Sequence, residues 1–231
     1  MTCEKTSTVE PQYVACLDID EKYGRTELGL MSNQVWHDDP RRLLFVLARY
    51  KFVSKMLKGC QSALEIGCAD AFGTRIIRQE VPYVLATDFD PVFIQDCLRR
   101  EAISPWPISF LVHDILSGPV KHVPFEAAFS LDVLEHIHPS SEDAFIRNIC
   151  DSLLPQGHLI VGSPSKESQE YASVISKQGH INCKTAEDMY RLFKKYFHNV
   201  LLFSMNDEMV HTGFSQLAHY LFVVCSGKKS H

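Results

Sequence analysis

The chain lacks features that would crosslink it or place it in a membrane. Its eight cysteines include no C-x-x-C pair, so no closed zinc site follows from their spacing. Several fall inside apolar strand or helix patterns, where a reduced thiol packs as a small hydrophobe. No apolar run approaches the ~20 residues that span a bilayer, and the acidic N-terminus lacks a secretory core. These absences predict a cytoplasmic protein with no membrane partner.

An excess of basic residues is also missing. The net charge is -5, the pI is about 6.1, and the basic pairs are scattered, so there is no electrostatic footprint for duplex nucleic acid. No internal repeat or low-complexity tract is present. With 231 residues, 45% of them hydrophobic and 22% charged, the chain suits one globular domain. We expect a monomer or homodimer that does not bind nucleic acid.

Short apolar strands alternate with helical patterns through most of the chain. The predicted strands are 62–66, 83–87, 108–112, 127–131 and 157–162, and the predicted helices are 40–57, 73–79, 91–101 and 141–154. This alternation predicts βαβ units in a mainly parallel, doubly wound α/β sheet. After a helix over 185–196, two strands at 200–205 and 219–225 have no helix between them, which predicts an antiparallel edge. Polar residues 1–38 are predicted to form an N-terminal arm or lid, and residues 39–231 the domain.

The turn over 64–73 follows the first predicted strand and opens a helix. In such sheets, ligands bind at the carboxyl ends of strands where the strand order reverses. Gly67 lets the backbone approach a ligand, and Cys68 and Ala69 keep the surface small. Glu65 would repel a pyrophosphate, so the turn favours a cationic, phosphate-free cofactor. The structural alternative is an ordinary tight turn between strand and helix.

Carboxylates follow the next two predicted strands. Asp88 lies ~20 residues after Gly67, where a carboxylate can accept both hydroxyls of a ribose. Asp90 is a weaker candidate because it can equally cap the following helix. Asp114 ends the third strand, where it can accept from an adenine amine or serve as a surface turn acid.

A cluster of ionisable residues follows the fourth predicted strand. Asp132, Glu135 and His136 can act as acid and base groups or hold an ion, or they can simply fix the loop. The connection over 163–184, which contains His180, is longer than a structural turn requires. His180 and His211 are the acceptor-side histidines to test, although each also suits a structural hydrogen bond. The mixture of aromatic, histidine and carboxylate groups favours a polar small molecule, such as a sugar.

Five segments carry a resemblance to a known family. E-I-G-C-A-D-A-F-G, A-T-D-F-D-P, H-D-I-L, L-D-V-L-E-H-I and L-L-P-Q-G-H-L-I-V occur in order over about residues 40–165. This order resembles the class I S-adenosylmethionine-dependent methyltransferases, of the small-molecule, ubiquinone-biosynthesis-like type. The resemblance implies a Rossmann-like, seven-stranded sheet with an antiparallel last strand in a single domain. It also implies S-adenosylmethionine as the cofactor.

The resemblance assigns roles to particular residues. The cofactor-binding residues would be Glu65, Gly67, Cys68 and Ala69 at the methionine end, Asp88 at the ribose, Phe89, Asp114 and Ile115 at the adenine, and Leu131 near the sulfonium. Ala69 and Ala71 depart from the family pattern, which usually has glycine at these places. The catalytic candidates are Asp132, His136 and His180.

A divalent metal is the lesser alternative at this site. In members that act on hydroxyls, an acidic-x-x-Glu-His pattern can bind such a metal, and Asp132, Glu135 and His136 match the spacing. The same residues often begin a helix for structural reasons alone, so the sequence-based assignment contains no metal ligand.

The predicted activity is methyl transfer from S-adenosylmethionine to a small polar acceptor, at oxygen, on a sugar or other metabolite. The donor is already activated, so positioning alone can supply much of the catalysis. No N-P-P-Y-type motif for methylating a base amine follows the fourth strand. One alternative is an NAD-dependent oxidoreductase, which Glu65 and the helix-free terminal strands disfavour. The other is a non-catalytic S-adenosylmethionine-binding module, which Ala69 and Ala71 motivate.

Overall fold

A computed structural model describes residues 8–100, 104–121 and 124–230. The strands are β1 (Ser62–Ile66), β2 (Tyr83–Asp88), β3 (Ser109–Val112), β4 (Phe125–Leu131), β5 (Leu153–Pro164), β6 (Phe197–Asn206), β7 (Met209–His211) and β8 (Tyr220–Lys228). The α-helices are α1 (Val14–Tyr23), α2 (Leu30–Asp38), α3 (Pro40–Met56), α4 (Thr74–Arg78), α5 (Pro91–Arg100), α6 (Glu142–Asp151), α7 (Val174–Gly179) and α8 (Ala186–Lys194). The eighth cysteine, Cys3, and the last residue of the predicted helix over 91–101, Glu101, lie outside the described residues, and the seven described cysteines are thiols.

The strands form one mixed sheet in the order β3-β2-β1-β4-β5-β8-β6-β7. The pairs from β3 through β5 are parallel, and β8 runs antiparallel to both of its neighbours, β5 and β6. The α/β class and the antiparallel last strand are confirmed. The strand count was wrong, because the loop after β6 folds back as the short strand β7 and makes eight. The predicted antiparallel edge is confirmed, because β8 pairs antiparallel with β5 and β6, and β6 pairs antiparallel with β7.

Two hydrophobic cores cover the two faces of the sheet. On one face, residues of α3 and α4 such as Val53 and Ile77 pack against β1, β4 and β8. On the other, Phe145 of α6 and Phe193 of α8 pack against β4, β5 and β8. Both faces of the central strands are therefore buried, as their continuous apolar runs predict.

Helix starts follow the capping residues in the sequence. Asp39 accepts the backbone N–H of Arg41 at the start of α3, directly before Pro40. Thr185 accepts the N–H of Asp188 at the start of α8. Each side chain satisfies an amide that the first helical turn leaves unpaired, so these predicted starts are confirmed.

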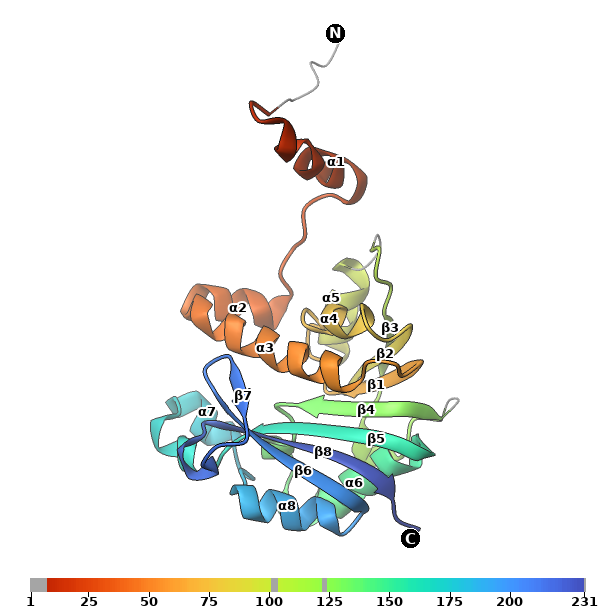
Figure 1. Cartoon of the computed structure of the whole chain (residues 1–231), viewed down its shortest axis with the longest axis vertical. Helices are drawn as coiled ribbons and strands as arrows, with labels where there is room; N and C mark the ends of the chain where they lie inside the picture. Colours follow the sequence, from red (N-terminus) through yellow and green to blue (C-terminus); the bar gives the residue numbers. More distant parts are fainter. Residues whose placement is uncertain (1–7, 101–103, 122–123, 231) are drawn as a thin grey trace.

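The N-terminal segment divides into two parts. α1 buries no residue and lies apart from the body, whereas α2 lies alongside α3 (Figure 1). The first turn of α2 is fixed to the body by Asp70, which accepts the N–H of Ser32 at 2.6 Å. None of the helices within the described residues has the length and hydropathy needed to cross a membrane.

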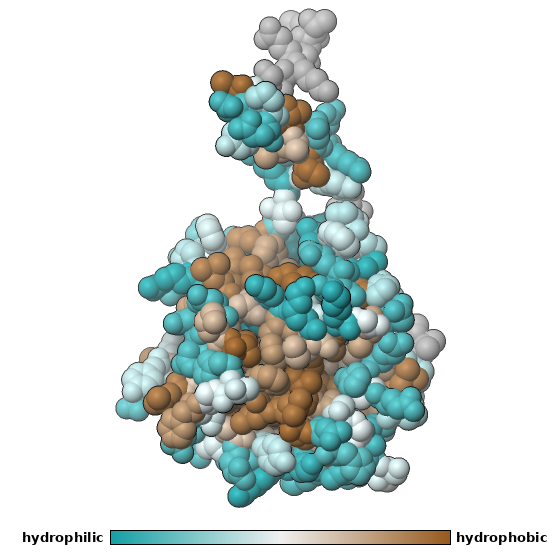
Figure 2. All heavy atoms as spheres, viewed as in Figure 1, coloured by the Kyte–Doolittle hydropathy of each residue, from teal (hydrophilic) through white to brown (hydrophobic). Residues whose placement is uncertain are grey.

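One part of the sheet is bare of helices. Below α3, the face of β6 and β8 shows a gathering of hydrophobic side chains (Figure 2). Leu201 is exposed there, beside the partly buried Phe203 and Val224. The carboxyl ends of β1 and β4, where the candidate site lies, are at a different place on the molecule.

Candidate active site

The site begins where the strand order reverses. From β1 the chain proceeds to β2 and β3 on one side, and β4 and β5 extend the sheet on the other. The turns that follow β1 and β4 therefore meet at the same edge. The two turns lie so close together that a Cβ atom at Gly67 would overlap the Cγ2 methyl group of Val133. This reversal point is the place where α/β sheets of this kind bind ligands.

The turn after β1 has a left-handed backbone. Gly67, Ala69 and Ala71 have φ values of 75°, 45° and 50°. The two alanines thus hold the conformation that glycine adopts without strain, which explains the family's glycine preference there. Asp88 fixes the turn, because its Oδ2 accepts the N–H of Ala69 at 2.9 Å and its Oδ1 accepts that of Asp90 at 2.9 Å.

Glu65 is enclosed below this turn and is only 1% exposed. Its Oε1 accepts the hydroxyl of Tyr50 at 2.8 Å, and its Oε2 accepts that of Thr74 at 2.5 Å. Burial outweighs these hydrogen bonds and raises the pKa of Glu65 to about 7. Both carboxyl oxygens are therefore engaged within the protein.

The remaining cofactor candidates divide by exposure. Phe89 is 72% exposed and Asp114 is also exposed, where it accepts the N–H of Leu116. Cys68, Ile115 and Leu131 are buried, at 2%, 5% and 6% exposure. Only Phe89 and Asp114 can therefore contact a ligand at the surface through their side chains. The three buried residues can contribute mainly backbone groups and the shape of the surface.

The turn after β4 has its own left-handed residue, Asp132, with a φ of 57°. Nη1 of Arg49, on α3, donates to both carboxylate oxygens of Asp132 at 2.8 and 2.7 Å. The Arg49 guanidinium also lies 3.9 Å from the centre of the Tyr220 ring, on β8. Asp132 is therefore turned toward Arg49.

Glu135, His136 and His180 come together beside this turn. One ligand atom from each lies within 4.8 Å of those from the other two, and the two imidazole centres are 5.2 Å apart. Of the three predicted catalytic residues, the structure thus brings His136 and His180 together, and Glu135 rather than Asp132 completes the group. His211 uses both ring nitrogens for hydrogen bonds within its own turn, to Asn206 and Gly213.

Hydrogen bonds orient both imidazoles. Nδ1 of His136 donates to the carbonyl of Gly179 at 2.9 Å, and Nδ1 of His180 donates to Oε1 of Gln169 at 2.8 Å. A carbonyl oxygen can only accept, so each Nδ1 carries a proton, and in a neutral imidazole this leaves the lone pair on Nε2. Burial, and then the neighbouring His136, lower the pKa of His180, which favours this neutral form. Metal-binding histidines have this arrangement.

Glu135 is 1% exposed, and Ser163 donates to its Oε2 at 3.2 Å. Burial, followed by the nearby Asp132, raises the pKa of Glu135 to about 8. Within the described residues, the buried side-chain polar atoms without a hydrogen-bond partner are Arg49 Nε, Glu135 Oε1, Glu167 Oε2 and Tyr220 OH. Of these, Oε1 of Glu135 lies in the group with His136 and His180, whereas Arg49 Nε and Tyr220 OH lie at the neighbouring Arg49–Asp132 ion pair. Buried atoms of this kind ordinarily have a partner, so the cluster is suited to holding a further group.

Neither Arg49 nor Tyr220 was predicted from the sequence to lie at this site. Arg49 stands three and four residues from Val46 and Phe45, on the apolar side of the predicted helix. A charge on an apolar stripe is a signal of a buried ion pair, and it was available in the sequence. Tyr220 lies within an apolar strand, where no pattern separates it from a core residue.

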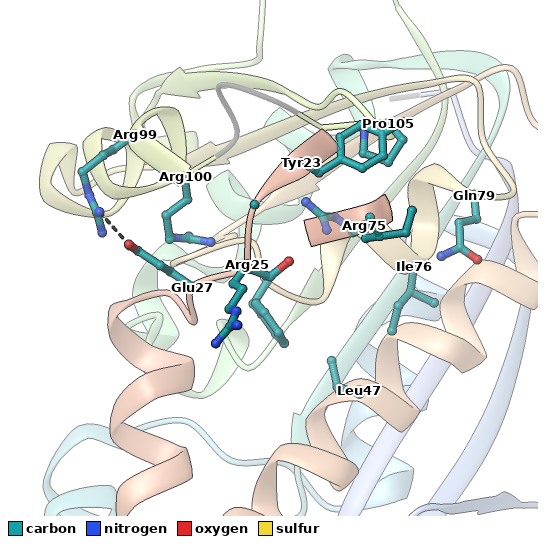
Figure 3. Close-up of a pocket in the computed structure, with 14 residues that line it drawn as sticks. Tyr23, Arg25, Glu27, Leu47, Arg75, Ile76, Gln79, Arg99, Arg100 and Pro105 are labelled. Atoms are coloured by element: carbon teal, nitrogen blue, oxygen red, sulfur yellow. Dashed lines mark hydrogen bonds and ion pairs between the residues drawn. The ribbon is translucent and has the colours of Figure 1, made fainter. Parts of the chain in front are cut away.

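A cavity of about 640 Å³ lies between the N-terminal arm and α4 (Figure 3). Tyr23, Arg25 and Glu27 of the arm face Ile76 and other residues of the body across it. None of the predicted cofactor or catalytic residues lines this cavity, so it is separate from the candidate site.

Residues 63–157 match a family described as a methyltransferase domain. No curated protein matches the sequence. Among solved structures, the methyltransferase domain of bacterial CtHen1-C is 16% identical, with a TM-score of 0.65 over 79% of this chain and 98% of that one. The N-methyltransferase NodS from Bradyrhizobium japonicum WM9, solved with S-adenosyl-L-homocysteine, is 19% identical. Its TM-score is 0.60 over 91% and 97% of the two chains.

A TehB-like methyltransferase from Corynebacterium glutamicum is 18% identical, with a TM-score of 0.59 over 85% of this chain and 96% of that one. At these identities the likeness is one of fold, and the domain match supplies the class of activity. The strand order, the left-handed turn after β1 and the domain match agree with the motifs found in the sequence. The chain therefore contains a methyltransferase domain over residues 63–157, on a fold that it shares with S-adenosylmethionine-dependent methyltransferases.

Proposed function

We propose that this enzyme methylates a hydroxyl oxygen of a small polar acceptor with the help of a divalent cation. The observation that carries the proposal is the convergence of Glu135, His136 and His180 at the carboxyl end of β4. One carboxylate and two imidazoles form a ligand set for a transition-metal dication. The oriented Nε2 lone pairs and the unpartnered Oε1 of Glu135 fit such an ion.

The cofactor belongs in the turns after β1 and β2. Gly67 and Ala69 supply a left-handed backbone for the methionine end, with Glu65 beneath them. Asp88 retains lone pairs beyond its two backbone hydrogen bonds, which suits a ribose. The exposed Phe89 offers a flat face for the adenine, and Asp114 lies at the end of the next strand. Leu131 is the last residue of β4. It lies between the turn after β1 and the group of Glu135, His136 and His180, and we assign the sulfonium to this position.

The chemistry is an in-line displacement, in which the acceptor oxygen bonds to the methyl carbon as the carbon–sulfur bond breaks. A bound dication lowers the pKa of a coordinated hydroxyl and orients it. Glu135, His136 and His180 would hold the ion, and the acceptor would enter past the exposed His136. Without the ion, the same Nε2 lone pairs are proton acceptors, which gives the residues a second possible use as bases.

The test measures release of S-adenosylhomocysteine from S-adenosylmethionine with fractions of a polar-metabolite extract. We expect chelation to abolish release and added Mn²⁺ to restore it. His180→Ala should lower turnover by ~100-fold or more, a loss typical of removing one metal ligand or base. His211→Ala is the matched control and should keep turnover within about threefold, because its ring bonds lie within its own turn.

The outcomes separate the parts of the proposal. Activity that survives chelation but not His180→Ala would assign the imidazoles as bases and reject the cation. Activity that survives both would reject the cluster. Mass and NMR analysis of the product identifies the methylated atom, and methylation at nitrogen would contradict the choice of a hydroxyl.

A further inference from the structure

Arg49 is a charged residue in an apolar place. It lies in the middle of α3, its side chain is 14% exposed, and residues near it on the same helix, Phe45 and Val46, pack on the core. Withdrawing an arginine from water is costly unless a carboxylate compensates it. Asp132 is that carboxylate, and the ring of Tyr220 covers one face of the guanidinium.

The ion pair acts on a strained turn. Asp132 is a non-glycine residue at a φ of 57°, a strained conformation that persists only when its surroundings fix it. Two contacts do so: its N–H donates to the carbonyl of Gly162 at 3.0 Å, and its carboxylate accepts from Arg49. The short helix with Glu135 and His136 begins two residues later, at Leu134.

The pairing also decides which acids can reach a cation. By sequence spacing, Asp132 is the first acid of the acidic-x-x-Glu-His pattern, yet it is not among the three residues whose ligand atoms converge. Its two oxygens both contact Nη1 of Arg49, while Oε1 of Glu135 has no partner. The group that remains for a cation has one carboxylate and two imidazoles.

We infer that Arg49 is a specificity-determining residue: by holding Asp132, it restricts the cation site to Glu135, His136 and His180, so that the site prefers transition metals to Mg²⁺. This inference rests on the proposed cation site. Imidazole ligands favour transition metals, whereas Mg²⁺ requires mainly oxygen ligands. If the carboxylate of Asp132 were released from Arg49, the site would gain a second oxygen ligand and would suit Mg²⁺ better.

The experiment measures binding and not turnover. Electron paramagnetic resonance follows the loss of the hexaaqua Mn²⁺ signal, and competition gives the affinity for Mg²⁺. In the unaltered protein we expect Mn²⁺ to bind well ahead of Mg²⁺. Arg49→Met, which keeps the length of the side chain and removes its charge, should narrow that preference by ~10-fold. The double variant Arg49→Met/Asp132→Asn should restore the original preference, because it removes the released carboxylate.

A second variant keeps the inference falsifiable if Arg49→Met fails to fold. Asp132→Asn alone should leave the Mn²⁺ affinity within about threefold, because Asp132 is not a ligand. A loss of ~10-fold or more would make Asp132 a ligand and overturn the inference. An unchanged Mn²⁺-to-Mg²⁺ preference in a folded Arg49→Met would do the same while leaving the cation site standing. Absence of Mn²⁺ binding in the unaltered protein would reject the cation site itself.

Discussion

Glu65 and Glu135 are two buried acids at neighbouring strand ends, and they differ in one respect. Each is 1% exposed, and burial raises the pKa of each, to about 7 and about 8. Both oxygens of Glu65 accept hydroxyls, from Tyr50 and Thr74, whereas Oε1 of Glu135 has no partner. A buried acid with complete hydrogen bonding is a structural part of the fold. One with an open oxygen beside two oriented imidazoles is equipped to bind something else.

The largest expected effect concerns the structural role of Glu65. Its folded-state pKa of about 7 exceeds its ordinary value of 4.5, so the folded protein holds the proton more tightly than the unfolded chain. The stabilisation that the protonated Glu65 contributes is fully present below pH 4.5. It decreases as the pH rises to about 7 and is lost above that pH. The loss across that window is roughly 3 kcal/mol, at about 1.4 kcal/mol per pKa unit.

Glu65→Gln should remove this part of the pH dependence, as measured by urea unfolding between pH 4.5 and 8. Glu187→Gln, on an exposed helix face, is the control and should follow the unaltered protein. If Glu65→Gln kept the full slope, Glu65 would not be the proton-binding group, and its contrast with Glu135 would lose its basis.

A smaller effect tests how the turn after β1 is held. Asp88→Ala removes the acceptor of the Ala69 and Asp90 amides and the proposed ribose contact. Affinity for S-adenosylhomocysteine, measured by calorimetry, should fall by ~10- to 100-fold, the size expected for one or two charge-assisted hydrogen bonds. Asp90→Ala, which removes a helix cap and no turn contact, should stay within about threefold. Equal losses in the two variants would remove Asp88 from the site.

The smallest effect compares the left-handed residues themselves. Ala69→Gly and Ala71→Gly relieve backbone strain but add freedom to the unfolded chain, so stability should change by about 1 kcal/mol or less. Asp132→Gly should destabilise the protein more, because it also removes the partner of the buried Arg49. Thermal unfolding of the three variants gives the order, and a reversed order would mean that the ion pair contributes little to the turn after β4.

The proposed cofactor end was more predictable from the sequence than the proposed acceptor end. Gly67, Ala69 and Asp88 lie within 22 residues, on turns whose place follows from two parallel strands and a rule about strand order. The proposed acceptor end joins Glu135 and His136 to His180, and the hydrogen bond from His136 to the carbonyl of Gly179 spans 43 residues along the chain. Local periodicity carries no information about such a pairing, so His136 and His180 were predicted separately, and their meeting was not.

The sequence by itself determined the parallel α/β sheet, the antiparallel last strand, and the turn that suits a cationic nucleoside cofactor, because each depends on local patterns of apolar, small and acidic residues. Tertiary structure decided which of Asp132 and Glu135 keeps an unpartnered carboxylate oxygen. That choice depends on Arg49, 83 residues before Asp132, and on the free energy cost of burying its charge without a partner. Spacing made the two acids equivalent, and the packing of α3 on the sheet separated them.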